Sequence, residues 1–387
     1  MDGMDKITYL DNAATTFPKP EEVYTFMDEF YRRNGVNLGR GASSFETSAS
    51  SIQKETRELL LKLFHCPLDK TVIFQPSATQ ALNLIIRGLD WKEGDVVYIS
   101  PFEHNAVLRP LNYLKEKFNL RVIQLAVDRE TISYNLEKIK YQFQETRPKV
   151  VIVSHASNVC GVVAPIKDIF GYAKKYNAIT VADMSQTAGL VDTDLMECNV
   201  DYAVFAGHKT LYGPFGIAGF VSTTSVNLKP LIYGGTGVES ANPFMPEILP
   251  IKYEAGSANI QAISGLHASL KWILKTGIDN IYNKEMEHCE AIIKALSQFD
   301  FIKLYVSKAQ KIGVISVTVD NYSSHSLANF FSENGLACRT GLQCAPLAHQ
   351  FLGTFPEGTI RFSLGYYSKE DDFKALGNVL FKLENLL

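Results

Sequence analysis

Short apolar runs alternate with longer stretches of helical periodicity through the middle of the chain. Seven runs rich in β-branched and aromatic side chains predict buried strands. They are Thr71–Gln75, Val96–Ser100, Arg121–Val127, Val150–Ser154, Ile179–Asp183, Tyr202–Ala206 and Ile217–Ser222. Amphipathic helical patterns lie between them at Ala78–Arg87, Asn105–Phe118 and Pro165–Tyr176. This alternation predicts an α/β domain in which a mostly parallel seven-stranded sheet is covered by helices.

The pattern changes near residue 265. A long helical stretch, Gly265–Phe299, precedes strand patterns at Gly313–Val319 and Thr359–Leu364 and a C-terminal amphipathic helix. We therefore expect a large domain over residues 31–264 and a smaller C-terminal α+β domain over residues 265–387. Residues 1–30 are expected to pack with the small domain or along the domain junction.

Composition and charge exclude several classes of function. The chain has 387 residues, of which 46% are hydrophobic and 20% charged, which is ordinary for a globular protein. The net charge is -3 and no Lys/Arg block is present, so neither nucleic acid nor a membrane is an expected partner. The six cysteines are scattered and form no Cys-x-x-Cys pair, and the N-terminus has no signal-peptide pattern. A cytoplasmic protein with reduced thiols is expected.

Lys209 stands just after a predicted strand, in Ala206-Gly207-His208-Lys209, and just before a glycine-rich turn. Burial at a strand end lowers the pKa of an ammonium group and frees the amine to attack a carbonyl. Most lysines are solvated surface residues instead. The polar residues at other strand ends favour the chemical role here.

Two further strand ends carry candidate ligands. Ser77 suits an N-cap, and the free N–H groups of Ala78 and Thr79 would then face an anion at a helix N-terminus. A plain helix cap is the alternative. His104 directly follows the strand Val96–Ser100 and suits stacking on a planar cofactor or proton transfer, although a lone histidine is more often structural.

Asp183 ends a very apolar strand, where an unpaired carboxylate is costly, so a cation is expected beside it. A protonated pyridine nitrogen or an arginine would serve. Gln186 would then donate to the phenolate oxygen of the same ring, and Asn158 offers another donor. Anion cap, histidine, strand-end aspartate and buried lysine together predict pyridoxal 5'-phosphate as the cofactor.

The C-terminal part adds a thiol and a guanidinium. Cys344 lies in a polar loop and is a candidate nucleophile, although it could be inert or could bind a metal together with Cys338 and His349. Arg361 lies within an apolar strand and needs a carboxylate, supplied either by an amino-acid substrate or by an internal Asp or Glu.

With these residues in place, the chain resembles the class V aminotransferase superfamily, whose members are fold type I pyridoxal-phosphate transferases. Within it the chain is similar to cysteine desulfurases, nearer the short-loop sulfur-assimilation branch. The matching motifs run nearly end to end: Tyr9-Leu10-Asp11-Asn12-Ala13-Ala14-Thr15, Phe102-Glu103-His104-Asn105, Ser157-Asn158-Val159, Ala182-Asp183-Met184-Ser185-Gln186, Gly207-His208-Lys209, Tyr253-Glu254-Ala255-Gly256-Ser257, Arg339-Thr340-Gly341-Leu342-Gln343-Cys344-Ala345 and Ile360-Arg361-Phe362-Ser363.

The resemblance implies a role for each cofactor-facing residue. Lys209 would be the Schiff-base lysine, Asp183 the partner of the ring nitrogen and Gln186 the donor to the ring oxygen. His104 would stack over the ring and take part in catalysis. The phosphate would be held by Ala78, Thr79 and His208, and by Ser257 of the neighbouring subunit, which implies a homodimer with composite sites.

The resemblance also implies the reaction. L-cysteine would be converted to L-alanine, and its sulfur would pass to Cys344 as a persulfide and then to a sulfur-acceptor protein, as in iron–sulfur cluster assembly. Asn158, Arg361 and Arg339 would hold the substrate. Selenocysteine lyase or another β-lyase is the nearest alternative, followed by an aminotransferase and by a catalytically silent partner in a sulfur-handling complex.

The sequence departs from the branch at two places. Ser77-Ala78-Thr79 replaces a Gly-Thr-Thr phosphate motif, and Leu342-Gln343 replaces a His-His pair just before the catalytic cysteine. The replacement at Leu342-Gln343 affects how the Cys344 thiol is activated and which sulfur-acceptor protein receives its sulfur.

Overall fold

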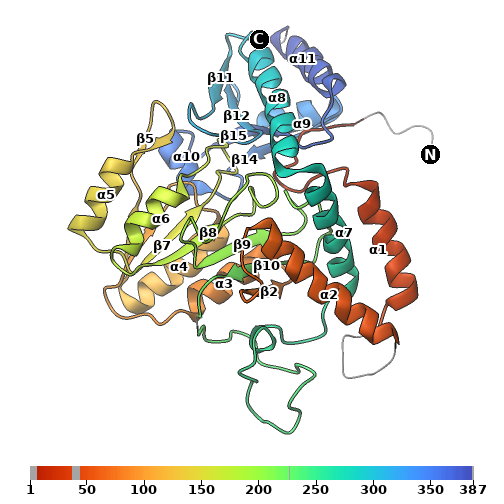
Figure 1. Ribbon diagram of the computed structural model, residues 1–387. Helices are drawn as coiled ribbons and strands as arrows, with labels where there is room; N and C mark the ends of the chain where they lie inside the picture. The colour runs from red at the N-terminus through yellow and green to blue at the C-terminus, as the bar shows by residue number, and fades with distance from the viewer. Residues whose placement is uncertain (1–6, 37–43, 226, 386–387) are drawn as a thin grey trace.

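A computed structural model describes residues 7–36, 44–225 and 227–385 (Figure 1). Residues 1–6 of the expected N-terminal segment lie outside the described residues. The larger sheet has seven strands in the order β2-β10-β9-β8-β7-β3-β4. Their bounds are β2 Thr71–Gln75, β3 Val96–Ile99, β4 Arg121–Gln124, β7 Val150–Ser154, β8 Ile179–Asp183, β9 Tyr202–Ala206 and β10 Ala218–Ser222. Only β10 runs antiparallel to its neighbours, which confirms the predicted mostly parallel α/β sheet.

Helices cover both faces of this sheet. Along β7, Val151 and Val153 join the hydrophobic core on one face, whereas Val150 and Ile152 join the core on the other. Burial on both faces explains why these strands are continuous apolar runs in the sequence. The first core receives α2 (Ser44–Leu63), α5 (Leu136–Glu145), α6 (Ile166–Lys174) and α7 (Ile260–Thr276), and the second receives α3 (Ala78–Gly88) and α4 (Asn105–Phe118).

Two predicted elements are divided in the structure. The predicted strand Arg121–Val127 is wrong beyond Gln124, because the chain leaves the sheet edge there and forms a hairpin from β5 (Val127–Asp128) and β6 (Ser133–Tyr134). The predicted helical stretch Gly265–Phe299 is two helices. Gly277 adopts a φ of 87°, which ends α7 and starts α8 (Ile278–Leu296) in a new direction.

A second sheet lies in the C-terminal part. It is antiparallel, with strands β11 (Ile302–Tyr305), β12 (Val314–Val319), β15 (Thr359–Ser363) and β14 (Arg339–Gly341) in that order. A separate hydrophobic core forms between this sheet and α8, α9 (Ser326–Glu333) and α11 (Glu370–Glu384). The short helix α10 (Pro346–Leu352) follows the cysteine loop. The division of the chain at residue 265 stays a prediction.

The N-terminal segment connects the two sheets. Strand β1 (Thr8–Tyr9) pairs with β13 (Leu336–Ala337), and Asp11 forms a bridge with Ser363 at the end of β15. Helix α1 (Glu21–Asn34) then packs against α7. A 3-10 turn, Ile251–Tyr253, precedes α7.

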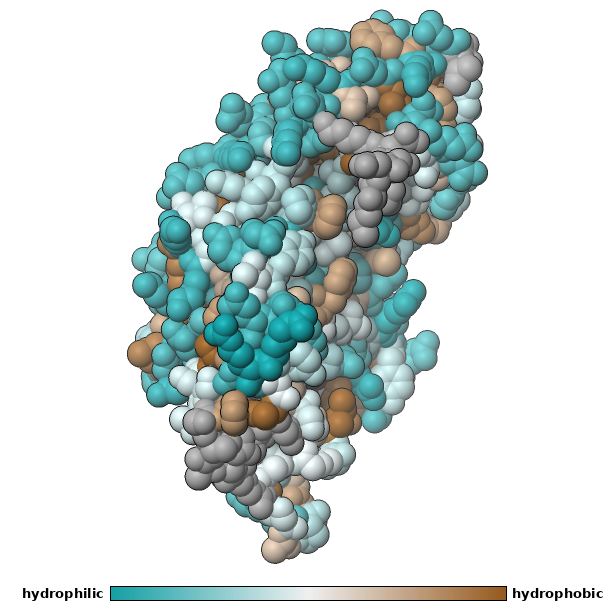
Figure 2. All heavy atoms as spheres, turned by 90° about the vertical axis from the view of Figure 1, so that its right-hand side faces the viewer, coloured by the Kyte–Doolittle hydropathy of each residue, from teal (hydrophilic) through white to brown (hydrophobic). Residues whose placement is uncertain are grey.

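A helix that crosses a lipid bilayer needs about 20 consecutive, mostly apolar residues. Within residues 7–36, 44–225 and 227–385, no helix has the length and apolar content to cross a lipid bilayer. Figure 2, which faces the α1 side, shows a largely hydrophilic surface on which the hydrophobic side chains are scattered.

Glu285 on α8 is a buried carboxyl group whose ionisation opposes folding. It is 4% exposed, and its Oε1 accepts a 2.9 Å hydrogen bond from Gly313 N. Burial raises its pKa from 4.5 to about 8. The pKa is higher in the folded state, so the neutral carboxyl stabilises the folded state fully below pH 4.5. This stabilisation is lost as the pH rises to 8.

We therefore expect Glu285→Gln to become progressively more stable than the wild type as the pH rises from 4.5 to 8. Above pH 8 the difference in the free energy of unfolding should reach roughly 5 kcal/mol. Denaturant unfolding at pH 5, 7 and 9 measures this difference. Glu290→Gln is the matched control, because Glu290 is on the same helix but its side chain is 60% exposed beside Lys311. A Glu285→Gln difference that does not change with pH would contradict the prediction.

Candidate active site

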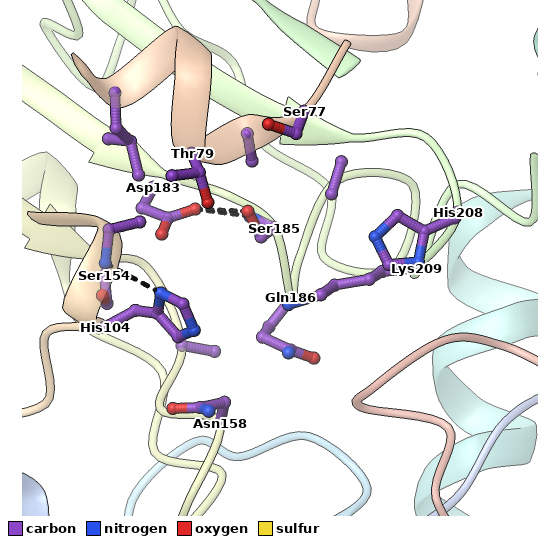
Figure 3. A pocket seen from close by; sticks show the side chains of 15 residues that line it. Ser77, Thr79, His104, Ser154, Asn158, Asp183, Ser185, Gln186, His208 and Lys209 are labelled. Atoms are coloured by element: carbon purple, nitrogen blue, oxygen red, sulfur yellow. Dashed lines mark hydrogen bonds between the residues drawn. The ribbon is translucent and has the colours of Figure 1, made fainter. Parts of the chain in front are cut away.

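A cavity of about 240 Å³ lies at the carboxyl ends of the parallel strands (Figure 3), the edge at which α/β sheets bind ligands. In Figure 3, His104 and Asn158 lie on one side of it and His208 and Lys209 on the other. Eight of the residues predicted from the sequence line it: Ala78, Thr79, His104, Asn158, Asp183, Gln186, His208 and Lys209.

One end of the cavity suits an anion. Ser77 caps α3, since its Oγ accepts a 3.2 Å hydrogen bond from Gln80 N, so the N–H groups of Ala78 and Thr79 begin the helix at the cavity wall. The buried Nδ1 of His208 has no hydrogen-bond partner in the described part of the chain. Burial, with the nearby charges of Lys209 and Lys19, lowers the pKa of His208 to about 4, so its ring is neutral.

Asp183 presents a fixed carboxylate to the cavity from the end of β8. Its Oδ1 accepts hydrogen bonds from the main-chain N (3.0 Å) and the Oγ (2.6 Å) of Ser185. No arginine forms an ion pair with Asp183 among the described residues, so the second oxygen is available to a cationic ligand. Ser185 was not predicted as a site residue, although an Asp followed two positions later by Ser is a local turn signal.

His104 is held in one orientation. It is the N-cap of α4, and its Nδ1 accepts a 3.0 Å hydrogen bond from Ala106 N, which places the ring proton on Nε2. Burial lowers the pKa of His104, and the charge of Lys209 lowers it further, whereas Asp183 opposes the shift. His104 is therefore a neutral imidazole that presents an N–H group.

Lys209 supplies an amine at the opposite wall. Burial lowers its pKa, Asp183 and Cys344 oppose this effect, and the charges of Arg361 and Arg339 add to it. Its main chain is clamped by the N-terminal segment. Thr15 Oγ1 donates to His208 O at 2.8 Å, and Thr16 Oγ1 donates to Lys209 O at 3.0 Å. Sequence reasoning missed both threonines, because nothing local links them to residue 209.

Two amides at the cavity wall bind the protein itself. Gln186 Nε2 donates to Ala13 O at 2.9 Å, and Asn158 Nδ2 donates to Gln343 O at 2.7 Å. Gln186 therefore ties the cavity to the N-terminal segment, and Asn158 ties it to the cysteine loop. Their contacts with a ring oxygen and a substrate stay predictions.

Arg361 and Arg339 share an internal carboxylate. Arg361 is 2% exposed, and its Nη2 lies 2.6 Å from Asp11 Oδ1, while its Nη1 donates to Asn158 O at 3.0 Å. Arg339 Nη2 lies 2.7 Å from Asp11 Oδ2. Of the two partners expected for Arg361, the structure shows the internal one. Its buried Nε has no hydrogen-bond partner among the described residues.

Cys344 lies on the loop between β14 and α10 and is exposed. Cys338 differs, because burial raises the pKa of its thiol to about 12. His349 is completely buried. No cluster of His, Cys, Asp or Glu in the described ranges is arranged to bind a metal, so the structure gives no support to a metal site formed with these two residues.

Ser257 lies apart from the other predicted residues. It is exposed and lines a second cavity of about 590 Å³ together with Gly216, Thr236 and Tyr253. Within one chain the structure therefore does not bring Ser257 into the cavity that contains Lys209.

Known proteins match almost the whole length of this chain. A probable cysteine desulfurase of Methanothermobacter thermautotrophicus is 30% identical over 385 residues, covering 98% of this chain and 95% of that protein. A probable cysteine desulfurase of Xylella fastidiosa is also 30% identical, over 98% of this chain and 92% of that protein.

Solved structures give the same fold. The apo structure of a cysteine desulfurase from Thermococcus onnurineus superposes with a TM-score of 0.91 at 26% identity, covering 98% of this chain and 95% of that one. The S-sulfonic acid form of the cysteine desulfurase CsdA from Escherichia coli has a TM-score of 0.88 at 24% identity, over 99% and 96% of the two chains. The family model described as aminotransferase class-V matches residues 8–376, and the chain belongs to this family.

Proposed function

We propose that this protein is a pyridoxal-phosphate-dependent cysteine desulfurase that converts L-cysteine to L-alanine and takes up the sulfur on Cys344. One observation carries the proposal: the amine of Lys209, the Asp183 carboxylate and the N-terminus of α3 meet in one cavity, with an exposed thiol on the adjacent loop. Relatives that match almost the whole chain are named probable cysteine desulfurases, which supports it.

The residues of the cavity fit pyridoxal phosphate. The N–H groups that begin α3 and the unpartnered Nδ1 of His208 suit its phosphate, and the free oxygen of Asp183 suits a protonated ring nitrogen. Lys209 would attach to its aldehyde. When bound, the cofactor supplies an electron sink that stabilises negative charge at the substrate Cα.

The chain's own residues supply binding and proton transfer. Arg361 would hold the substrate carboxylate with guanidinium N–H groups that Asp11 and Asn158 O leave unoccupied, and Arg339 adds positive charge beside it. The lowered pKa of Lys209 would let its amine remove the α-proton of the bound substrate. His104, a neutral N–H donor at the cavity wall, would hand over a proton.

Cys344 would complete the reaction as a nucleophile. Its thiolate attacks the substrate sulfur, an S–S bond forms, and the C–S bond breaks with its electron pair going to the substrate carbon. Protonation of that carbon yields alanine. L-cysteine and the enzyme thiol thus become L-alanine and an enzyme persulfide, whose sulfur then passes to a sulfur-acceptor protein or is released as sulfide by an added thiol reductant.

A spectrum and a product assay test this function. The purified protein loaded with pyridoxal phosphate is expected to absorb in the visible range, and L-cysteine plus dithiothreitol should yield alanine and sulfide in equal amounts. A coloured protein that releases neither product would refute the desulfurase activity while keeping the cofactor. A protein that takes up no pyridoxal phosphate would refute the whole proposal.

We also propose that the active form is a homodimer in which Ser257 contacts the phosphate in the partner's cavity. Large hydrophobic side chains are exposed on the segment before Ser257, including Phe244 at 80% and Tyr233 at 70%. Such exposure is unusual for a free surface and suits a second copy of the chain. Light scattering is expected to give twice the mass of one chain, and a monomer that is fully active would contradict the proposal.

A further inference from the structure

The cysteine loop has an unfavourable backbone conformation at the thiol itself. Gln343 and Cys344 have φ values of 41° and 58°, so two consecutive residues other than glycine lie in the left-handed region. A side chain strains the backbone in this region, so contacts around the loop must hold it. The side chain of Gln343 makes several of these contacts.

The side chain of Gln343 points into the protein. It is 7% exposed, its Nε2 donates to Thr359 O at 2.9 Å, and its Oε1 lies 2.8 Å from His349 Nε2. Thr359 is the first residue of β15, the strand that carries Arg361. The glutamine amide therefore connects the cysteine loop both to this strand and to helix α10.

His349 is the second member of this contact. It is fully buried, and its Nδ1 lies 2.8 Å from Thr354 Oγ1. Burial lowers its pKa to about 4, so the imidazole is neutral and carries one ring proton. With Thr354 donating to Nδ1, that proton lies on Nε2 and is donated to Gln343 Oε1. Each polar side-chain atom of Gln343 and His349 thus has a hydrogen-bond partner.

The main chain on both sides of the thiol is attached to the cavity. Gln343 O accepts a 2.7 Å hydrogen bond from Asn158 Nδ2, and Cys344 O accepts one of 2.7 Å from Asn105 N. Asn158 lines the cavity, and Asn105 follows His104 at the start of α4. Rotation of the Gln343–Cys344 backbone out of the left-handed region would move both acceptor carbonyls relative to these donors.

From this geometry we infer that Gln343 and His349 form a positioning pair, which holds the Cys344 thiol in place for attack on the substrate sulfur. The inference rests on the proposed function, because it gives Cys344 the role of sulfur acceptor. Neither residue lines the cavity that contains Lys209. They act through the loop backbone, which joins the thiol to two elements of the cavity wall. Misplacement by about 1 Å is enough to lower a rate by about a hundredfold.

The test compares Gln343→Leu with Gln350→Leu in the enzyme loaded with pyridoxal phosphate. Gln350 is exposed on α10, so the same substitution there is a matched control. After mixing with L-cysteine without reductant, persulfide on Cys344 is followed by mass spectrometry. Gln343→Leu is expected to form it about a hundredfold more slowly. L-cysteine also changes the visible spectrum, which reports substrate binding. The L-cysteine concentration that gives half of this change should stay within about threefold of the wild-type value.

Two His349 variants keep the test decisive if Gln343→Leu does not fold. His349→Gln retains an N–H group where Nε2 stands and is expected to stay within about tenfold of the wild type, whereas His349→Leu should lose about a hundredfold. Equal losses in both His349 variants would show a merely structural role and overturn the inference. Equal persulfide rates in Gln343→Leu and Gln350→Leu would also overturn it.

A measurement independent of turnover separates this inference from the proposed function. Alkylation of Cys344 by iodoacetamide reports the freedom of the loop, and its rate is expected to differ by at least about fivefold between Gln343→Leu and Gln350→Leu. If the wild type forms no persulfide, the proposed function fails, and unequal alkylation rates would still show that Gln343 holds the loop. Equal alkylation rates would refute the positioning whatever the activity.

Discussion

Replacing Lys209 by alanine is expected to lower L-cysteine desulfuration by at least about a thousandfold, because it removes both covalent attachment of the cofactor and the proton-transferring amine. Burial already lowers the pKa of this amine, and the neighbouring Asp183 limits the shift. Sulfide and alanine assays measure the loss. Borohydride reduction followed by mass spectrometry shows whether a pyridoxyl group is fixed to the chain at residue 209.

Lys167→Ala is the control for this variant, since Lys167 is a surface lysine with a 64% exposed side chain beside Glu197. It should retain full activity and the reduced pyridoxyl group. If Lys209→Ala still carried a borohydride-fixed pyridoxyl group at another lysine and turned over at the wild-type rate, the assignment of the cavity would be wrong.

Replacing Cys344 by alanine is expected to stop sulfur transfer while leaving the cofactor and substrate binding intact. Sulfide and alanine formation should fall by at least about a hundredfold, because no other thiol is exposed beside the cavity to act as nucleophile in the described part of the chain. The visible spectrum and its response to L-cysteine should remain. Mass spectrometry of the wild type should find one extra sulfur atom on the peptide that contains Cys344.

Cys338→Ala is the matched control, six residues earlier on the same segment. Burial raises the pKa of the Cys338 thiol to about 12, so it stays protonated near neutral pH and cannot act as a thiolate. Its loss should change activity by less than about threefold. Full sulfide release by Cys344→Ala, or an extra sulfur atom on Cys338 instead, would refute the assignment of the nucleophile.

Much of the fold and of the cavity could be predicted from local patterns. Five-residue apolar runs such as Val150–Ser154 and Tyr202–Ala206 are strands in the structure with the same bounds. Asp183 ends the buried strand β8 and Lys209 follows the buried strand β9, and the two strands are parallel neighbours. Because parallel strands end at the same edge, polar residues at their carboxyl ends necessarily converge. The convergence of the residues that line this cavity therefore followed from their positions in the chain.

Other features depended on contacts between distant segments. Asp11 and Arg361 form an ion pair across 350 positions of sequence, and Thr16 reaches the carbonyl of Lys209. The sequence showed that Arg361 needs a carboxylate but left its source open. The packing of the N-terminal segment between the two sheets determines these partners, and local periodicity does not predict that packing.

The sequence by itself determined the class of fold, the order of its strands along the chain and the residue types gathered at their ends, because burial and strand polarity act locally. Only the tertiary structure decided which atoms those residues engage. It placed Ser257 away from the cavity of its own chain and directed Gln343 toward His349. Whether a hydrogen bond forms depends on differences of a few tenths of an ångström in the distance between donor and acceptor. A linear pattern does not encode such differences.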